Sequence, residues 1–321
     1  MPNIDGGSFS SFPTAAIRWH AQDPALFQEA IAFTAAQSGF LARLIEKDYF
    51  CSVLLQLISN NAEELVFKGG TCLSKVHAHF CRLSEDLDFC ISTPAHSSRT
   101  NRRNCVAKFR SVLDRVASAQ PQLRVIEALE GFNNSTHYQA LLQYTSQLTS
   151  QPETIRIEIS LREPIVMSAH IGAARTALLN PLRCEELVEP FPVRCLSWKE
   201  TMAEKFRAAL CRKDIAIRDF FDVDFAVLRV GLQVDDVELI QLLTGKLKVA
   251  GVGAVDLSAS RLSALARQLN TQLRPVLRDS DYAIFDLERA IEIVRVVANN
   301  APKQNKSSTI NQTQNIPTRF I

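Results

Sequence analysis

The most regular pattern in the chain is the alternation of apolar and polar residues between Ile155 and Leu161. Ile155, Ile157, Ile159 and Leu161 alternate there with Arg156, Glu158 and Ser160. A period of two residues predicts a strand with one buried face, which puts Glu158 on the polar face. Short apolar runs predict further strands at residues 64–68 and 123–129. Another strand is predicted where Asp86 and Asp88 alternate with Leu87, Phe89 and Ile91.

Apolar residues at helical spacing account for most of the remaining chain. They predict helices at 25–37, 40–60, 71–80, 109–119, 198–212, 217–230, 234–246, 258–269 and 282–297. All predicted strands lie in the first half, so we predict an α+β fold with a mixed sheet core, flanking helices and a C-terminal helical domain. The predicted domains are residues 16–195 and 196–298, between a flexible leader at 1–15 and a disordered tail at 299–321.

Composition narrows the class of protein. The 321 residues are 46% hydrophobic and carry a net charge of +2, which argues against a protein that coats polyanions along its whole surface. The eight cysteines include no CxxC pair and no His/Cys cluster at zinc spacing, and we find no signal peptide and no long apolar run. We therefore predict a cytoplasmic protein with reduced thiols and no membrane association. Core packing explains the even spacing of Cys72, Cys81 and Cys90, and we interpret His77 and His79 as packing or surface residues.

Two adjacent motifs carry candidate chemistry. Gly69 and Gly70 follow a predicted strand and precede a helix, so backbone N–H groups there could approach a phosphate closely. Asp86 and Asp88 would point to one face of the next strand, about 6 to 7 Å apart, close enough to share Mg²⁺ ions. Taken singly, a glycine pair is more often a tight connection and an acidic pair often belongs to an exposed strand. Together they predict a site for a nucleoside triphosphate and divalent metal.

These segments resemble a known family. The runs FKGGTCLSK and RLSEDLDF resemble the first motif of the AbiEii/AbiGii toxin family, a branch of the polymerase-beta-like nucleotidyltransferase superfamily. The Glu46-Lys47-Asp48-Tyr49 segment is similar to the one that precedes this motif. The run EKFRAALCRKDIAIRDFFDVDF resembles the family's second signature. The resemblance covers roughly residues 45–229, and two motifs in the right order are more specific than either alone.

The resemblance implies a role for each matching residue. We call Gly69, Gly70 and Thr71 the glycine corner; by the resemblance, Gly70 and Thr71 take the place of the superfamily's Gly-Ser turn that holds the triphosphate, and Thr71 keeps the hydroxyl of that serine. The implied metal ligands are Asp86, Asp88 and Glu158, and the last would help to activate the acceptor hydroxyl. Lys205 and Arg212 would hold phosphate, and Asp219 matches the Arg-Asp step. The alternative for Arg218, Asp219 and Asp222 is a set of helix ion pairs, with Arg218 and Asp222 at i,i+4.

The implied function is a metal-dependent nucleotidyltransferase, the toxin of a toxin–antitoxin or abortive-infection module, using an NTP with Mg²⁺ or Mn²⁺. The resemblance implies an RNA acceptor, with the tRNA 3′ end first, and a cognate or kinase-like antitoxin as partner. A basic stretch gives modest support for RNA, although such a run is more often a solvated helix face: Arg99, Arg102, Arg103, Lys108, Arg110 and Arg115. Transfer to a small-molecule or protein hydroxyl, and a non-catalytic nucleotide-binding role, remain alternatives.

Overall fold

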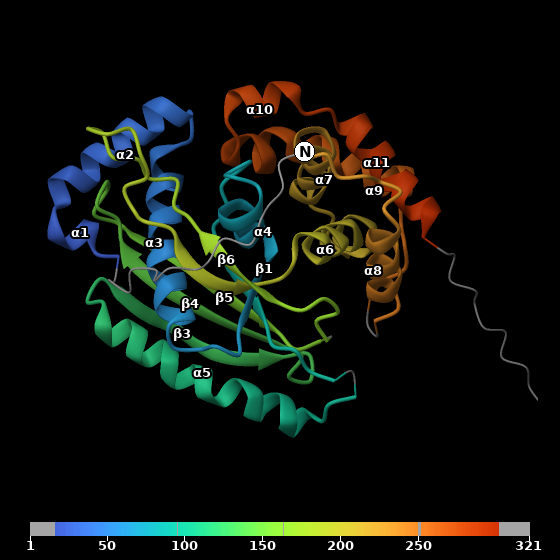
Figure 1. The fold of residues 1–321 in the computed structure, drawn as a ribbon, viewed down its shortest axis with the longest axis horizontal. Helices are drawn as coiled ribbons and strands as arrows, with labels where there is room; N and C mark the ends of the chain where they lie inside the picture. The colour runs from blue at the N-terminus through green and yellow to red at the C-terminus, as the bar shows by residue number, and fades with distance from the viewer. Residues whose placement is uncertain (1–16, 95, 163, 250–251, 302–321) are drawn as a thin grey trace, which may run out of the picture.

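The computed structural model describes residues 17–301 except 95, 163, 250 and 251. The predicted leader at 1–15 lies outside the described residues, and so does the predicted tail at 299–321 from residue 302 onward. Its first two residues, 299 and 300, are helical instead of disordered. A mixed sheet fills the first half and helices fill the second (Figure 1), which confirms the predicted α+β class. Among the described residues, we find no helix with the length and apolar character needed to cross a membrane.

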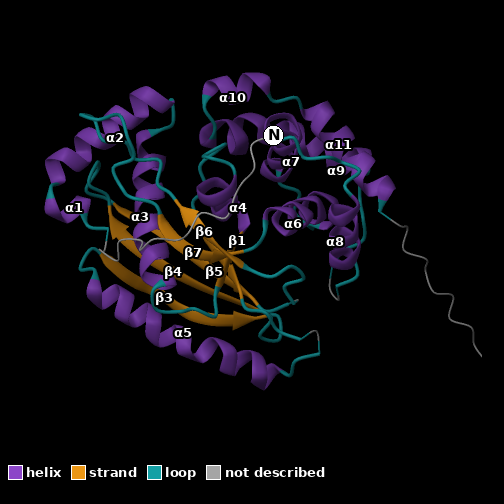
Figure 2. Cartoon of the chain, viewed as in Figure 1, coloured by secondary structure: helices purple, strands orange, loops and turns teal. Residues whose placement is uncertain are grey.

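Seven strands form one mixed sheet, drawn in orange in Figure 2, in the order β3-β4-β5-β2-β1-β7-β6. Their bounds are β1 Val66–Lys68, β2 Leu87–Cys90, β3 Leu123–Phe132, β4 His137–Thr145, β5 Pro152–Ser160, β6 His170–Ala174 and β7 Phe191–Cys195. Strand β2 pairs antiparallel with β1 and parallel with β5. The sequence pattern did not predict β4, β6 or β7, although β4 alternates half-buried and buried residues along most of its length.

One face of the sheet is covered by helices of the first half. These helices are α1 Trp19–Gln22, α2 Pro24–Ser38, α3 Ala42–Ser59 and α5 Arg99–Ala119. The apolar positions of β2 and β5, such as Leu87, Phe89 and Ile157, belong to the same core as Leu54 of α3 and Phe109 of α5. Because side chains alternate along a strand, the polar residues of β2 and β5 must point to the opposite face.

The helices that follow Ser197 gather beside that opposite face, on the right of Figure 1. They are α6 Trp198–Cys211, α7 Ile217–Phe225, α8 Val237–Leu247, α9 Ala259–Gln268, α10 Asp279–Ile284 and α11 Leu287–Asn300, with π-helical turns at Ala226–Val230 and Leu269–Leu273 and a 3-10 turn at Arg274–Val276. They share a second apolar core, which also takes in Leu73 and Cys81 from the first half. The amide of Leu83 donates to the carbonyl of Val276. The two halves of the chain therefore interlock around the segment between β1 and β2.

Several predicted elements differ from the structure. The helix expected at 109–119 begins at Arg99, and the α-helical part of the one expected at 217–230 ends at Phe225. The helix expected at 71–80 is a single α-turn, α4 Gly69–Cys72, followed by the π-helical turn Leu73–His77. The strand with the acidic pair begins at Leu87, so Asp86 lies one residue before it. The helix expected at 282–297 is two helices, because Phe285 is extended and the Asp286 side chain caps a new helix by accepting from the amide of Arg289.

Candidate nucleotide and metal site

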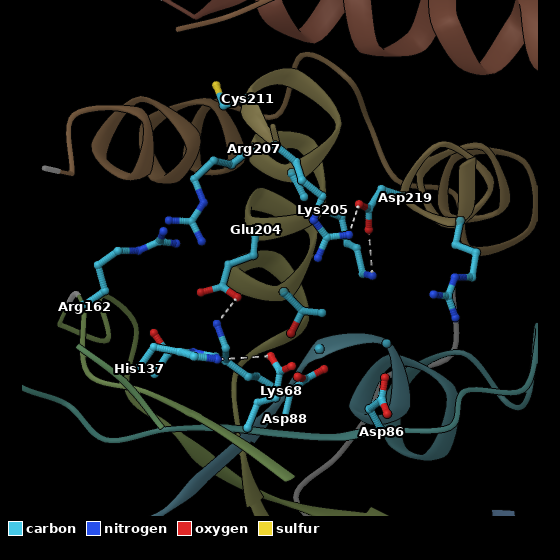
Figure 3. Close-up of a pocket in the computed structure, with 18 of the residues that line it drawn as sticks. Lys68, Asp86, Asp88, His137, Arg162, Glu204, Lys205, Arg207, Cys211 and Asp219 are labelled. Atoms are coloured by element: carbon cyan, nitrogen blue, oxygen red, sulfur yellow. Dashed lines mark hydrogen bonds and ion pairs between the residues drawn. The ribbon is translucent and has the colours of Figure 1, made fainter. Parts of the chain in front are cut away.

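A cavity of about 810 Å³ lies between the polar face of the sheet and helix α6. It is lined by all but one of the predicted site residues, from segments far apart in the chain: Gly69, Gly70, Asp86, Asp88, Glu158, Lys205, Arg212 and Asp219. In Figure 3, Glu204 of α6 points down to Lys68, Lys205 points to Asp219, and Arg207 points toward Arg162. The exception is Thr71, which is buried.

The floor of the cavity is a row of polar side chains across four strands. Lys68 of β1 is registered with Asp88 of β2, Asp88 with Glu158 of β5, and Glu158 with Gln139 of β4. Neighbouring strands are about 4.8 Å apart, so the two carboxylates are held side by side. Burial, and then the charges of Glu158 and Asp86, raise the pKa of Asp88 to about 6. A bound cation would offset the burial and the mutual repulsion of these carboxylates.

The glycine corner lies directly against this floor. Gly69 has φ +76°, and a Cβ placed on it would lie 2.0 Å from Oδ2 of Asp88. A Cβ on Gly70 would lie 2.7 Å from Nη2 of Arg82 and 3.0 Å from Oγ of Ser84. Only glycine fits at both positions, and the missing side chains leave the backbone open to the cavity.

We expect Gly69→Ala to disrupt the site, because the added methyl group must displace the Asp88 carboxylate. The matched control is Gly39→Ala, since Gly39 has the same φ of +76° and no atom within 4 Å of a Cβ. The control should lose about 1 kcal/mol of stability from backbone strain alone and keep its activity. Urea unfolding and nucleotide-transfer rates measure both effects. Equal losses of activity in the two variants would contradict this geometry.

The structure gives Thr71 a different position from the one expected. Its hydroxyl donates to the backbone carbonyl of Asp86 rather than facing the cavity. The hydroxyl therefore ties the helical turn after the glycines to the start of β2, and it fixes the backbone from which Asp86 projects. This hydroxyl is not placed to contact a triphosphate, as the expected match to the superfamily serine would require.

Helix α6 forms the roof of the cavity and connects to its floor by ion pairs. One carboxylate oxygen of Glu204 lies 2.8 Å from Nζ of Lys68, and the other lies 3.2 Å from Nζ of Lys246. Burial alone would raise the pKa of Glu204, but the charges of Lys68 and Lys246 outweigh it and hold the pKa well below its usual range. The helix begins at the cap Ser197, whose hydroxyl accepts from the amide of Glu200.

A buried ion network joins the two sequence motifs. Arg82 makes a bidentate pair with Asp222 at 2.7 and 2.9 Å. Nζ of Lys205 lies 2.7 Å from a carboxylate oxygen of Asp222 and 3.2 Å from one of Asp219. The other oxygen of Asp219 lies 3.0 Å from Nη1 of Arg212. The partners of Asp222 are therefore Arg82 and Lys205, not the helix neighbour Arg218 considered as an alternative. Lys205 is held by two carboxylates while lining the cavity, so its position is fixed in advance.

This network predicts loss of stability in acid. Burial alone would raise the pKa of Asp222, but Arg82 and Lys205 overcome it and lower the pKa to about 2, from an ordinary value of 3.8. A carboxyl with a lowered folded-state pKa stabilises the fold above its ordinary pKa, and this contribution of about 2 kcal/mol is lost as the pH falls from about 4 to 2. Urea unfolding at pH 5 and pH 3 should show a steeper loss for the wild type than for Asp222→Asn. Parallel losses would contradict the assignment.

Several residues of the cavity were not predicted. Lys68, Arg82 and Glu204 belong to the sequence motifs, but only the fold shows that all three line this cavity. His137 of β4 also lines it, and its Nε2 lies 3.8 Å from a carboxylate oxygen of Glu158. The predicted basic stretch lies on α5, and the cavity lining, as far as the structure describes it, includes none of its six residues. Arg102 is buried and donates to the carbonyls of Ser97 and Asn134. The cavity is instead surrounded by other basic residues: Arg156, Arg162, Arg207, Arg212, Lys213 and Arg218.

A mixed sheet that presents carboxylates on adjacent strands, beside a glycine corner, is an arrangement suited to a nucleotidyltransferase. The family model described as nucleotidyl transferase AbiEii toxin of type IV toxin–antitoxin systems matches residues 53–293. The chain belongs to this family, and it is a nucleotidyltransferase of the toxin type. A search of curated proteins gave no match.

Solved structures with a similar course of the chain include two bacterial proteins. MenT4, a nucleotidyltransferase toxin from Mycobacterium tuberculosis H37Rv, is 17% identical, with a TM-score of 0.48 over 87% of this chain and 100% of that one. JHP933 from Helicobacter pylori is 17% identical, with a TM-score of 0.43 over 86% of this chain and 92% of that one.

Proposed function

We propose that the protein transfers a nucleoside monophosphate from an NTP to the 3′ end of an RNA, with tRNA as the first acceptor to test. One observation carries this proposal: a single cavity brings together the glycine corner, three carboxylates and an excess of basic side chains. We further propose that residues 16–195 supply the floor of the site and the helical domain, residues 196–298, supplies its roof.

The acidic residues of the floor suit a hard divalent cation. Asp86, Asp88 and Glu158 offer carboxylate oxygens, which Mg²⁺ and Mn²⁺ prefer, and the raised pKa of Asp88 marks a cluster that gains from such a charge. When bound there, a divalent cation would neutralise the triphosphate and lower the pKa of the acceptor hydroxyl.

The chain's own residues would position the reactants. The open backbone of Gly69 and Gly70 would receive the triphosphate, and Arg82 and Lys205 would face its negative oxygens. The acceptor oxygen forms a bond to the α-phosphorus as the bond to the β-phosphate oxygen breaks, and pyrophosphate leaves. Glu158 would accept the hydroxyl proton, since burial, followed by the Asp86 charge, raises its pKa above the ordinary carboxyl value.

The charge of the cavity favours an RNA acceptor over a small neutral one. Nine basic and five acidic side chains line it, while the whole chain carries only +2. Arginines that line the cavity, such as Arg156 within β5, Arg162 just beyond its end and Arg212 at the end of α6, are suited to a phosphate backbone. Because acceptor and triphosphate are both anionic, a positive rim lowers the cost of bringing them together.

The type IV family also implies an antitoxin as partner. We propose that the antitoxin is a separate protein, either kinase-like or a direct binder, and that the toxin acts in the cytoplasm, where its RNA acceptors are found.

Labelled NTPs tested one at a time with purified protein, Mg²⁺ and total RNA separate the candidate functions. The proposal expects label in RNA of tRNA size, removable by trimming the 3′ end. Label in a small molecule or in protein would show that the acceptor is a hydroxyl of that molecule and not RNA. No transfer with any NTP, metal or acceptor would contradict the proposal as a whole.

A further inference from the structure

A cluster of thiol and imidazole side chains lies on the edge of the sheet, behind the glycine corner. Cys72 is the last residue of α4, His77 ends the π-helical turn, and Cys195 is the last residue of β7. His170 begins β6 and is registered directly opposite Cys195. The cluster was not expected from the sequence, because its members come from segments about a hundred residues apart.

The ligand atoms of this cluster are close enough to share one ion. One ligand atom from each of Cys72, His77 and Cys195 lies within 4.8 Å of the other two. The fourth side chain contacts the group through Nε2 of His170, which lies 3.6 Å from Sγ of Cys195. In a tetrahedral zinc site the ligand atoms are separated by roughly 3.3 to 3.8 Å, which follows from Zn–S and Zn–N bond lengths. Cys72, His77 and Cys195 would have to move closer together to reach that geometry. His170 would have to swing in from its place beside Cys195.

The surroundings keep the cluster open and oriented. A Cβ on Gly172 would lie 2.5 Å from Cγ1 of Val76, 3.0 Å from Sγ of Cys195 and 3.8 Å from Nε2 of His170, so a side chain there would crowd the cluster. Nε2 of His77 bonds the carbonyl of Leu196 at 3.1 Å. Since a carbonyl only accepts, this bond puts the His77 proton on Nε2 and leaves the lone pair on Nδ1, the arrangement typical of a metal-bound histidine.

We propose that Cys72, His77, Cys195 and His170 form a structural zinc site. Two thiolates and two imidazoles are soft and borderline ligands, which select Zn²⁺ and disfavour the Mg²⁺ suited to the carboxylate cavity. The inference does not rest on the proposed function.

The site would tie the glycine corner to the sheet. Cys72 lies three residues after Gly69 in the same short helical turn, and β7 pairs with β1 immediately before that turn. A zinc ion would link this turn to β6 and β7, and would hold the corner without touching a nucleotide.

The test is the metal content of the full chain, purified with reductant and without added metal or chelator. Elemental analysis should find about one zinc per chain in the wild type, since four ligands make one closed site. After zinc removal, Co²⁺ titration should give the intense absorption of tetrahedral cobalt with thiolate charge transfer. Cys72→Ser combined with Cys195→Ser should lose both signals.

Two further variants separate metal binding from folding. His170→Ala changes an exposed residue and should weaken zinc retention against a competing chelator while the circular dichroism spectrum stays that of the wild type. Cys51→Ser is the matched buried thiol, because Cys51 is fully buried on α3 and, among the described residues, belongs to no cluster of possible metal ligands. It should keep the zinc. Metal-free wild type with unchanged fold, or zinc unaffected by the Cys72 and Cys195 changes, would overturn the proposal. So would a Cys72–Cys195 disulfide found by mass spectrometry in its place.

Discussion

Asp88→Asn is expected to lower the nucleotide-transfer rate by about a thousandfold or more while leaving the protein folded. Asn keeps the shape of the side chain but removes the charge at the centre of the row formed with Lys68 and Glu158. Because burial and neighbouring acids already raise the pKa of Asp88, the uncharged side chain should be tolerated by the fold. The loss should therefore appear in catalysis and metal affinity, not in stability.

The matched control for this change is Asp279→Asn, whose side chain is 91% exposed and lies outside the cavity. Its transfer rate should equal that of the wild type. Initial rates over a range of Mg²⁺ concentrations make the comparison. Substantial transfer by Asp88→Asn at any metal concentration would remove Asp88 from the site we describe.

Arg82→Met should lower the free energy of unfolding by about 3 to 5 kcal/mol, the usual cost of leaving one partner of a buried ion pair behind. Arg82 and Asp222 are almost fully buried, and the pair joins the segment before β2 to helix α7. Methionine fills similar space but leaves Asp222 with Lys205 as its remaining cation. The interlock between the two halves of the chain should loosen.

Arg289→Met is the control with matched geometry. Arg289 pairs with Asp224 through the same two atoms at the same distances, 2.7 and 2.9 Å, but its side chain is 36% exposed. Asp224 is only 4% exposed, but water can reach it once the half-exposed Arg289 side chain is shortened, so the expected loss is smaller, about 1 to 2 kcal/mol. Urea unfolding of both variants measures the difference. Equal losses would show that burial does not set the strength of the Arg82 pair.

The sequence predicted the parts of this fold that depend on local pattern. Strand β5 follows from alternation, and α6 follows from helical spacing. The catalytic candidates also follow locally, because the glycine corner and the acidic pair are close in the chain. Asp86 and Asp88 line one cavity even though the strand begins only at Leu87.

The rest depends on contacts between distant segments. Lys68 and Glu204 are 136 positions apart, and neither stands out until β1 faces α6. The alternative pair of Arg218 with Asp222 was reasonable at helical spacing, but tertiary packing brought Arg82 and Lys205 closer. The predicted helix is interrupted before Leu287 because the Asp286 side chain caps a new helix there. The spacing of apolar residues does not indicate this interruption. The thiol and imidazole cluster could not be predicted either, because its residues come from distant segments of the chain.

The most direct test of the account is a crystal structure with a non-hydrolysable NTP analogue and Mn²⁺, with the metal located by its anomalous scattering. The account predicts Mn²⁺ among Asp86, Asp88 and Glu158, with the triphosphate against Gly69 and Gly70. A nucleotide bound elsewhere, or manganese away from these three carboxylates, would contradict it.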